Sequence, residues 1–216
     1  MKLYHYAIGL LFPPKCVLCA KLLKKDETDL CRICRVKAPA YGNTKRKPQF
    51  LDSLAAIWYY EGNVRASILR YKFRGRRSYA AAYGRLLAMR VQQEHPEGFD
   101  LLTFIPISAR RRWKRGYDQV ELLARAVGRE LGMEPVPALK KVRHNRPQSG
   151  ISGEAERRAN VLGAYRSINR EVSGKRVLLL DDILTTGATA SEAARVLKTA
   201  GAAEVHCAVL AAAGKN

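Results

Sequence analysis

The chain has 216 residues, enough for one sizeable hydrophobic core and a small appendage but too few for two large domains. Its hydrophobic and charged fractions, 47% and 27%, are ordinary for a soluble globular protein, and no run reaches the ~20 apolar residues of a membrane span. The formal net charge of +20 predicts attraction to polyanions such as nucleic acid, anionic lipid or phosphorylated metabolites, although a solvated basic face would also account for it.

The first apolar run, residues 7–12, is short for a secretory signal, ends at Pro13 and Pro14, and is followed by no small-residue cleavage site. We interpret it as a helix docked on the protein, which predicts a cytoplasmic location. Thiols stay reduced in that compartment, so cysteine pairs there bind metal more often than they form disulfides.

Four of the five cysteines form two Cys-x-x-Cys turns, Cys16 with Cys19 and Cys31 with Cys34, separated by eleven residues. Each turn directs two thiolates at one ion, and two turns complete a closed tetrahedral site for Zn²⁺. A closed site leaves no position for water, which predicts a structural role in a segment too small to have its own core. A redox-active dithiol is the alternative.

The polar, basic residues 43–49 predict a linker between a zinc module, residues 1–50, and a larger domain, residues 51–216. In the larger domain, apolar runs alternate with helical patterns, which favours an α/β fold around a mostly parallel sheet. The expected strands are residues 54–60, 101–107, 177–180 and 205–210, and the expected helices are residues 64–71, 78–93, 118–131 and 189–200. Ser78 is the expected N-cap of the second helix, and Gly132 and Gly201 are the expected helix stops.

The most specific stretch is residues 177–189, in which an apolar strand leads through Asp181 and Asp182 into a turn and a helix. Ligands of open parallel sheets bind at the carboxyl ends of strands, where these carboxylates can accept hydrogen bonds from ribose hydroxyls. Backbone N–H groups at a helix start bind anions, and a glycine lets a phosphate approach the backbone. The pattern therefore predicts a ribose 5-phosphate ligand, with the phosphate held by Thr185, Thr186, Gly187, Ala188 and Thr189.

Other interpretations of this stretch are less specific. The turn contains no lysine, so it is not a P-loop, and it lacks the glycine spacing of a dinucleotide-binding turn. A strand that happens to end in two acids, followed by threonines that cap a helix, remains the structural alternative.

Residues 177–189 are similar to the phosphoribosyl diphosphate signature of type I phosphoribosyltransferases. Together with the two cysteine pairs, they resemble the ComF family, competence-associated proteins with an N-terminal zinc module and a phosphoribosyltransferase domain. Further matching segments are residues 11–16, 71–75, 105–107, 114–119, 146–150 and 156–161. Asp118 stands where the family more often has asparagine, and residues 152–157 lack one arginine of the family's usual run.

The resemblance implies that an acceptor nitrogen attacks C1′ of phosphoribosyl diphosphate as the Mg²⁺-bound diphosphate leaves, while Asp181 and Asp182 orient the ribose hydroxyls. Adjacent side chains on a regular strand point opposite ways, so contact of either one with metal-bound water or a backbone amide is the alternative. The acceptor is not indicated by the sequence. The diphosphate needs cations, and a basic run follows the expected strand 101–107, although a solvated loop is the alternative. This run contributes candidate contacts to diphosphate or to DNA phosphates: Arg110, Arg111, Arg112, Lys114 and Arg115. A second loop, residues 143–153, is expected to close over the ligand.

Two functions fit the sequence. One is a phosphoribosyltransferase with an unidentified acceptor. The other is a non-catalytic protein, either a sensor of phosphoribosyl diphosphate or an accessory protein that binds single-stranded DNA. The resemblance points to DNA uptake during natural transformation, with single-stranded DNA and the helicase of the uptake machinery as partners. Aromatic residues among the cations, such as Trp113, would stack on bases or pack within the protein.

Overall fold

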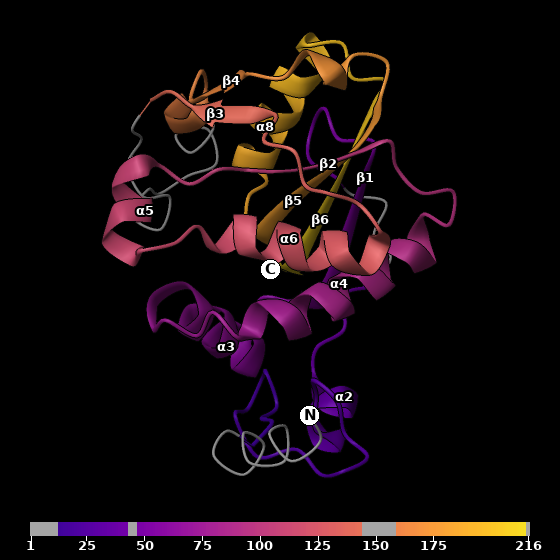
Figure 1. The fold of residues 1–216 in the computed structure, drawn as a ribbon, viewed down its shortest axis with the longest axis vertical. Coiled ribbons are helices and arrows are strands. Elements are labelled where there is room, and N and C mark those ends of the chain that lie inside the picture. The colour runs from indigo at the N-terminus through magenta and orange to yellow at the C-terminus, as the bar shows by residue number, and fades with distance from the viewer. Residues whose placement is uncertain (1–12, 43–46, 144–158, 215–216) are drawn as a thin grey trace, which may run out of the picture.

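A sheet of four parallel strands forms the centre of the fold in the computed structural model, which describes residues 13–42, 47–143 and 159–214 (Figure 1). The strands are β1 (Ser53–Tyr59), β2 (Leu101–Phe104), β5 (Arg176–Leu184) and β6 (Glu204–Ala212), in the order β1-β6-β5-β2. This arrangement confirms the predicted α/β class and the four predicted strands.

Strand β5 shows why its sequence is apolar throughout. Val177 and Leu179 pack on one face of the sheet, Leu178 and Leu180 pack on the other, and none of the four is more than 1% exposed. The strand is longer than predicted, because its ladder to β6 continues through Asp181 to Leu184. Strand β2 is shorter than predicted and ends at Phe104, because Pro106 has no N–H to donate to a ladder.

Helices cover both faces of the sheet (Figure 1). One face packs against α4 (Tyr79–Glu94) and α6 (Gln119–Leu131), and the other packs against α8 (Ala188–Thr199). Helix α3 (Gly62–Phe73) lies beyond α4 and contacts the cysteine-rich segment, residues 13–42. An antiparallel ribbon that the sequence did not predict, β3 (Leu139–Lys141) with β4 (Tyr165–Ser167), packs on α8.

The ends of the helices follow the predictions in part. Gly132 ends α6 in the left-handed conformation, with φ of 68°, as predicted. Ser78 precedes α4, but its backbone is already helical and its side chain makes no cap hydrogen bond. The basic run after β2, expected to be a loop, forms the short helix α5 (Ala109–Arg115). The predicted helix of residues 7–12 lies outside the described residues, as does nearly all of the predicted loop 143–153.

The cysteine-rich segment, residues 13–42, includes helix α2 (Arg32–Lys37) and packs on α3 and α4. Ser67 of α3 donates a hydrogen bond to the carbonyl of Val17, and Arg70 donates one of 2.5 Å to the carbonyl of Leu18. Cys16 and Leu18 belong to the same hydrophobic core as residues of α3 and α4. The segment is thereby fastened to α3 by its first cysteine turn. Within the described ranges, no helix is both long and apolar enough to cross a bilayer.

Candidate ligand pocket and metal centre

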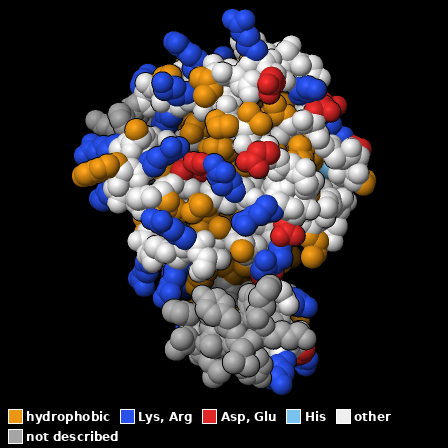
Figure 2. Space-filling model, viewed as in Figure 1, with side chains coloured by type: hydrophobic (Ala, Val, Ile, Leu, Met, Phe, Trp, Pro, Cys, Tyr) orange, Lys and Arg blue, Asp and Glu red, His pale blue; other side chains and the backbone are white. Residues whose placement is uncertain are grey.

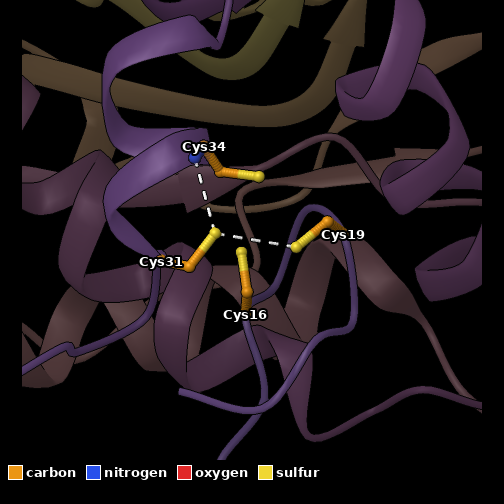
Figure 3. A group of neighbouring side chains, drawn as sticks. All are labelled: Cys16, Cys19, Cys31 and Cys34. Atoms are coloured by element: carbon orange, nitrogen blue, oxygen red, sulfur yellow. Dashed lines mark hydrogen bonds between the residues drawn. The ribbon is translucent and has the colours of Figure 1, made fainter. Parts of the chain in front are cut away.

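The four cysteines of the two turns converge on one point (Figure 3). Their sulfur atoms all lie within 4.8 Å of one another, and Cys19 Sγ lies 3.7 Å from Cys31 Sγ. Zn–S bonds of about 2.3 Å in a tetrahedron place neighbouring sulfurs about 3.8 Å apart. None of the four forms a disulfide. The cluster can therefore hold a metal ion such as zinc.

The electrostatics of the cluster agree with a bound cation. Burial acts to raise the pKa of the Cys16 thiol, but backbone hydrogen bonds from Cys19 and Cys31 outweigh it and lower the pKa to about 7. Burial and the three neighbouring thiols raise the pKa of Cys34 above its ordinary range. Four sulfurs this close repel one another as thiolates unless a cation lies between them, and thiolates are the ligands that zinc prefers.

The candidate ligand site is a cavity of about 840 Å³ at the carboxyl end of β5. Its walls come from α3, the segment after β2, α5, the start of α6 and the β3–β4 ribbon. Asp181, Asp182, Thr185 and Thr189 all line it, so the structure brings the ends of the predicted signature to one cavity. Figure 2 shows lysine and arginine side chains spread over the visible face of the molecule, with few acidic ones among them.

The two aspartates face opposite sides of the sheet and have different roles. Asp182 is 4% exposed, and its two oxygens accept from Lys72 Nζ and Gln119 Nε2, each at 2.8 Å. Asp181 accepts one hydrogen bond, from the backbone N–H of Asp182, and no other donor among the described residues reaches it. Burial and the charge of Asp182 raise the pKa of Asp181 to about 8. Asp182 is therefore committed to protein partners, and Asp181 has an oxygen left for a ligand.

The turn after β5 leads directly into α8, as predicted. Thr185 and Thr189 line the cavity, and with Gly187 they also line a smaller adjoining one of about 60 Å³. Thr186 Oγ1 accepts from the backbone N–H of Ala188, the first residue of α8, at 3.4 Å. Gly187 has φ of 78°, and a side chain there would collide with Pro48. Glycine is thus required here by the backbone and by the contact with Pro48.

The predicted basic residues divide into two groups. Arg111, Lys114 and Arg115 line the cavity. Arg112 instead pairs with Asp118 at 3.7 Å and with Glu121 at 3.5 Å, and Arg110 does not line the cavity. Helix α5 forms because the Ser108 side chain caps its start and Gly116 ends it in the left-handed conformation. Trp113 is 88% exposed, so it does not pack within the described protein.

Asp118 has a structural role at the start of α6. It is the N-cap of α6 and accepts hydrogen bonds from the backbone N–H groups of Val120, Glu121 and Ile107 at 2.9, 3.2 and 3.1 Å. It therefore ties the segment after β2 to the start of α6. Tyr117, next to it, donates a hydrogen bond to the carbonyl of Tyr71 and so joins the same region to α3.

Sequence reasoning missed several residues that line the cavity. Lys72 and Gln119 hold Asp182 and lie in two segments that carry the family resemblance, which was the only signal for them. Lys141 and Tyr165 come from the ribbon, with Lys141 Nζ 3.3 Å from the Tyr165 hydroxyl. Burial and the nearby Arg111 lower the pKa of Lys141 to about 8. Arg65 of α3 also lines the cavity.

Comparisons with known proteins agree with these features. Residues 120–216 match the family described as "Phosphoribosyl transferase domain". The chain is 30% identical over 200 residues to DNA utilization protein YhgH of Escherichia coli strain K12, covering 88% of this chain and 87% of that one. It is 26% identical to Competence protein F of Haemophilus influenzae, with 89% of this chain and 94% of the relative covered.

A third relative, Competence protein ComFC of Bacillus subtilis, is 27% identical over 91% of this chain and 84% of its own length. Among solved structures, a glutamine phosphoribosylpyrophosphate amidotransferase of B. subtilis complexed with ADP and GMP has a TM-score of 0.44 at 24% identity. The match covers 65% of this chain and 30% of that one.

Proposed function

This chain belongs to the ComF family of phosphoribosyltransferase-domain proteins, and on that premise we propose that it binds phosphoribosyl diphosphate with Mg²⁺ and acts in DNA uptake. The observation that carries the ligand is the cavity in which Asp181, the Thr185 turn and the cations of α5 meet. The role in DNA uptake is supported by the names of the relatives, two competence proteins and a DNA utilization protein. A cytoplasmic location, and a zinc module of residues 1–50 before a phosphoribosyltransferase-like domain of residues 51–216, belong to the same proposal.

Each end of the cavity suits one part of this ligand. The start of α8 offers backbone N–H groups and the hydroxyls of Thr185 and Thr189 to the 5′-phosphate. The ribose hydroxyls donate to the open oxygen of Asp181. The diphosphate lies toward Arg111, Lys114 and Arg115, whose charges stabilise it as a leaving group. The same turn also contributes to the 5′-phosphate site through the backbone of Thr186, Gly187 and Ala188.

The residues present also fit Mg²⁺, a hard cation that takes oxygen ligands and keeps several waters. Asp181 is the carboxylate that would hold the ion or one of its waters, because both oxygens of Asp182 are already bonded. When bound with the ligand, Mg²⁺ neutralises charge on the diphosphate. If transfer occurs, the acceptor nitrogen bonds to C1′, the C1′–O bond breaks with its electron pair leaving on the diphosphate, and the nitrogen loses a proton.

We expect calorimetry to detect binding of phosphoribosyl diphosphate only when Mg²⁺ is present. Thr185→Val should weaken it by about tenfold or more, because one hydrogen bond to a charged group contributes about 1.5–3 kcal/mol. Thr199→Val, at the exposed far end of α8, is the matched control and should leave the affinity unchanged. Equal affinity without Mg²⁺, or in the Thr185 variant, would contradict the assignment.

Release of diphosphate distinguishes the enzyme from the sensor. An enzyme should release diphosphate when phosphoribosyl diphosphate, Mg²⁺ and a suitable amine or base are supplied together. A protein that binds the ligand but releases none with any acceptor tested fits the non-catalytic alternative.

A second candidate function, binding of single-stranded DNA, is favoured by the surface next to the cavity. Helix α5 presents five cations and the exposed Trp113. A second basic turn, with Arg74, Arg76 and Arg77, lies beside it, because Arg77 Nη2 donates to the carbonyl of Gly116 at 3.3 Å. Cations that follow a backbone, together with an exposed aromatic ring, suit single strands. The helicase of the uptake machinery is proposed as a partner from the family resemblance alone.

We expect the affinity for single-stranded DNA to fall by ~0.7 log units per log unit of salt for each phosphate neutralised. Replacing Arg110, Arg111 and Lys114 by alanine should flatten this slope, whereas replacing Arg170 and Lys175, two exposed residues shortly before the amino end of β5, should not. Fluorescence anisotropy at several salt concentrations measures it. Phosphoribosyl diphosphate should compete, since Arg111 and Lys114 also line the cavity. No binding even at low salt would rule out this second function.

A further inference from the structure

Helix α3 has two faces with different environments. Val64, Ser67, Ile68 and Tyr71 are fully buried in the body of the protein. The other face carries Arg65, Leu69, Lys72 and Phe73, which all line the cavity. These four are spaced by four, three and one residues, so they form a single stripe along the helix. The stripe is a wall of the cavity separate from the turn at the start of α8.

This wall is held in place by contacts on the buried face. Ser67 and Arg70 bond the carbonyls of the first cysteine turn, and the Tyr71 hydroxyl donates to the carbonyl of Gln119 at 2.6 Å. Lys72, within the stripe, bonds Asp182 of β5. Helix α3 is therefore fastened to the cysteine-rich segment, to α6 and to the central sheet, so the stripe is presented on a rigid element.

The stripe combines apolar surface with one unused cation. Leu69 and Phe73 lie in the same cavity as Tyr60, Ile107 and Ile183, and the Arg115 guanidinium lies 4.6 Å from the centre of the Phe73 ring. Arg65 is exposed, and its side chain has no ion pair or hydrogen bond to any residue that the structure describes. Mostly apolar walls with a small number of polar or charged groups are typical of small-molecule sites.

The charges of the cavity point to a second, anionic ligand. Six cations line it against the two carboxylates of Asp181 and Asp182, a formal excess of four positive charges: Arg65, Lys72, Arg111, Lys114, Arg115 and Lys141. Phosphoribosyl diphosphate with one Mg²⁺ brings a charge of about −3, because its phosphate carries about −2, its diphosphate about −3 and the ion +2. Positive charge is then left over, and Arg65 is the cavity cation on the apolar stripe whose side chain makes no ion pair within the described residues.

We propose that the α3 stripe is the second-ligand site of this cavity and takes a planar ring that bears an anionic group such as a carboxylate. The ring packs on Leu69 and Phe73, and the anionic group bonds the Arg65 guanidinium, whose fork matches a carboxylate. The inference rests on the proposed function in so far as this ligand is the acceptor, but binding to the stripe is testable without phosphoribosyl diphosphate.

The test uses the full-length, metal-loaded protein and three probes, each titrated with and without phosphoribosyl diphosphate and Mg²⁺. Benzoate is planar and anionic, benzamide is planar and neutral, and cyclohexanecarboxylate is anionic but not planar. Saturation-transfer NMR detects weak binding of each. We expect benzoate to bind at least fivefold more tightly than the other two. Arg65→Gln should remove that advantage, and Leu69→Ala should weaken both planar probes.

Arg166→Gln, an exposed arginine on β4 that does not line the cavity, is the matched control and should bind benzoate like the unmodified protein. The site is wrong if benzoate binds Arg65→Gln as well as it binds the unmodified protein, or if none of the probes binds. Either result can occur while phosphoribosyl diphosphate still binds, which leaves the proposed function intact. If phosphoribosyl diphosphate does not bind but benzoate binds in a way that depends on Arg65, the proposed function is contradicted and the proposed second-ligand site is supported.

Discussion

Replacing Cys31 by serine is expected to abolish stoichiometric zinc binding and to unfold the cysteine-rich segment. Cys31 is the N-cap of α2, and serine is a good N-cap, so the substitution removes a metal ligand without removing the cap. Structural zinc contributes about 10–16 kcal/mol of binding free energy in small zinc domains, which exceeds the stability of most whole domains. Metal analysis of protein purified without added zinc, together with thermal unfolding, measures both effects.

Cys207→Ala is the control, because this fifth cysteine is buried in β6 and does not belong to the cluster. It should keep one zinc per chain. The Cys31 variant should also speed hydrogen exchange in α3, since Ser67 and Arg70 lose ordered partners in the first cysteine turn. Unmodified protein with almost no zinc and with its four cysteines paired as disulfides would show that the cluster is not a metal site.

The parts of the fold that the sequence predicted are those with a periodic pattern. β5 is apolar because both of its faces are buried, and α6 carries a repeated apolar stripe that ends at Gly132. The β3–β4 ribbon has three residues in each strand, too few to show a period, and it depends on Leu139 pairing with the distant Ser167. Helix α5 has no apolar stripe, and it is held by its end residues Ser108 and Gly116 and by bonds from Arg112 and Arg115 to α6 and its cap.

The residues of the candidate site also fall into two groups, those predicted from local sequence and those that only the fold brings together. Residues 181–189 form one continuous segment, so local sequence was enough to predict them together as one site. The partners of Asp182 come from α3 and α6, and Lys141 comes from the ribbon, so only the folded chain brings them together. The sequence predicts that the adjacent side chains of Asp181 and Asp182 point opposite ways, but it does not indicate which one serves the ligand. The structure separates them by their partners. Because their partners differ, we expect substitution of Asp182 and substitution of Asp181 to have different effects on stability and on ligand binding.

Asp182→Asn should destabilise the protein by about 3 kcal/mol, because it leaves the largely buried ammonium group of Lys72 without its carboxylate partner. An asparagine cannot restore both bonds. If its oxygen accepts from Lys72, its amide meets the amide of Gln119, and Gln119 cannot turn because its own oxygen accepts from Arg115 at 2.7 Å. Denaturant unfolding measures the loss, and weaker binding of phosphoribosyl diphosphate should accompany it because the cavity wall loosens.

Asp181→Asn should have the opposite effect on stability and a direct effect on binding. An unfolded aspartate ionises near pH 4, about its ordinary value, whereas burial and the charge of Asp182 raise the pKa of Asp181 to about 8. Between these values the folded protein binds more protons, so stability falls as pH rises, and asparagine removes that slope. The variant should therefore gain stability relative to the unmodified protein between pH 6 and pH 8. Its affinity for Mg²⁺ and phosphoribosyl diphosphate should nevertheless fall by ~1–3 kcal/mol, because the ligand loses its open carboxylate oxygen.

Unfolding midpoints at pH 6 and pH 8, and calorimetry at pH 8, give both quantities for each variant. The two substitutions remove the same charge from neighbouring positions, so each is the matched control of the other. If Asp181→Asn destabilises the fold as much as Asp182→Asn does, the raised pKa is not a property of Asp181. If both variants fold fully and bind the ligand unchanged, neither carboxylate belongs to the site. Loss of affinity in a stable Asp181→Asn protein would mean that this carboxylate serves the ligand at the expense of the fold.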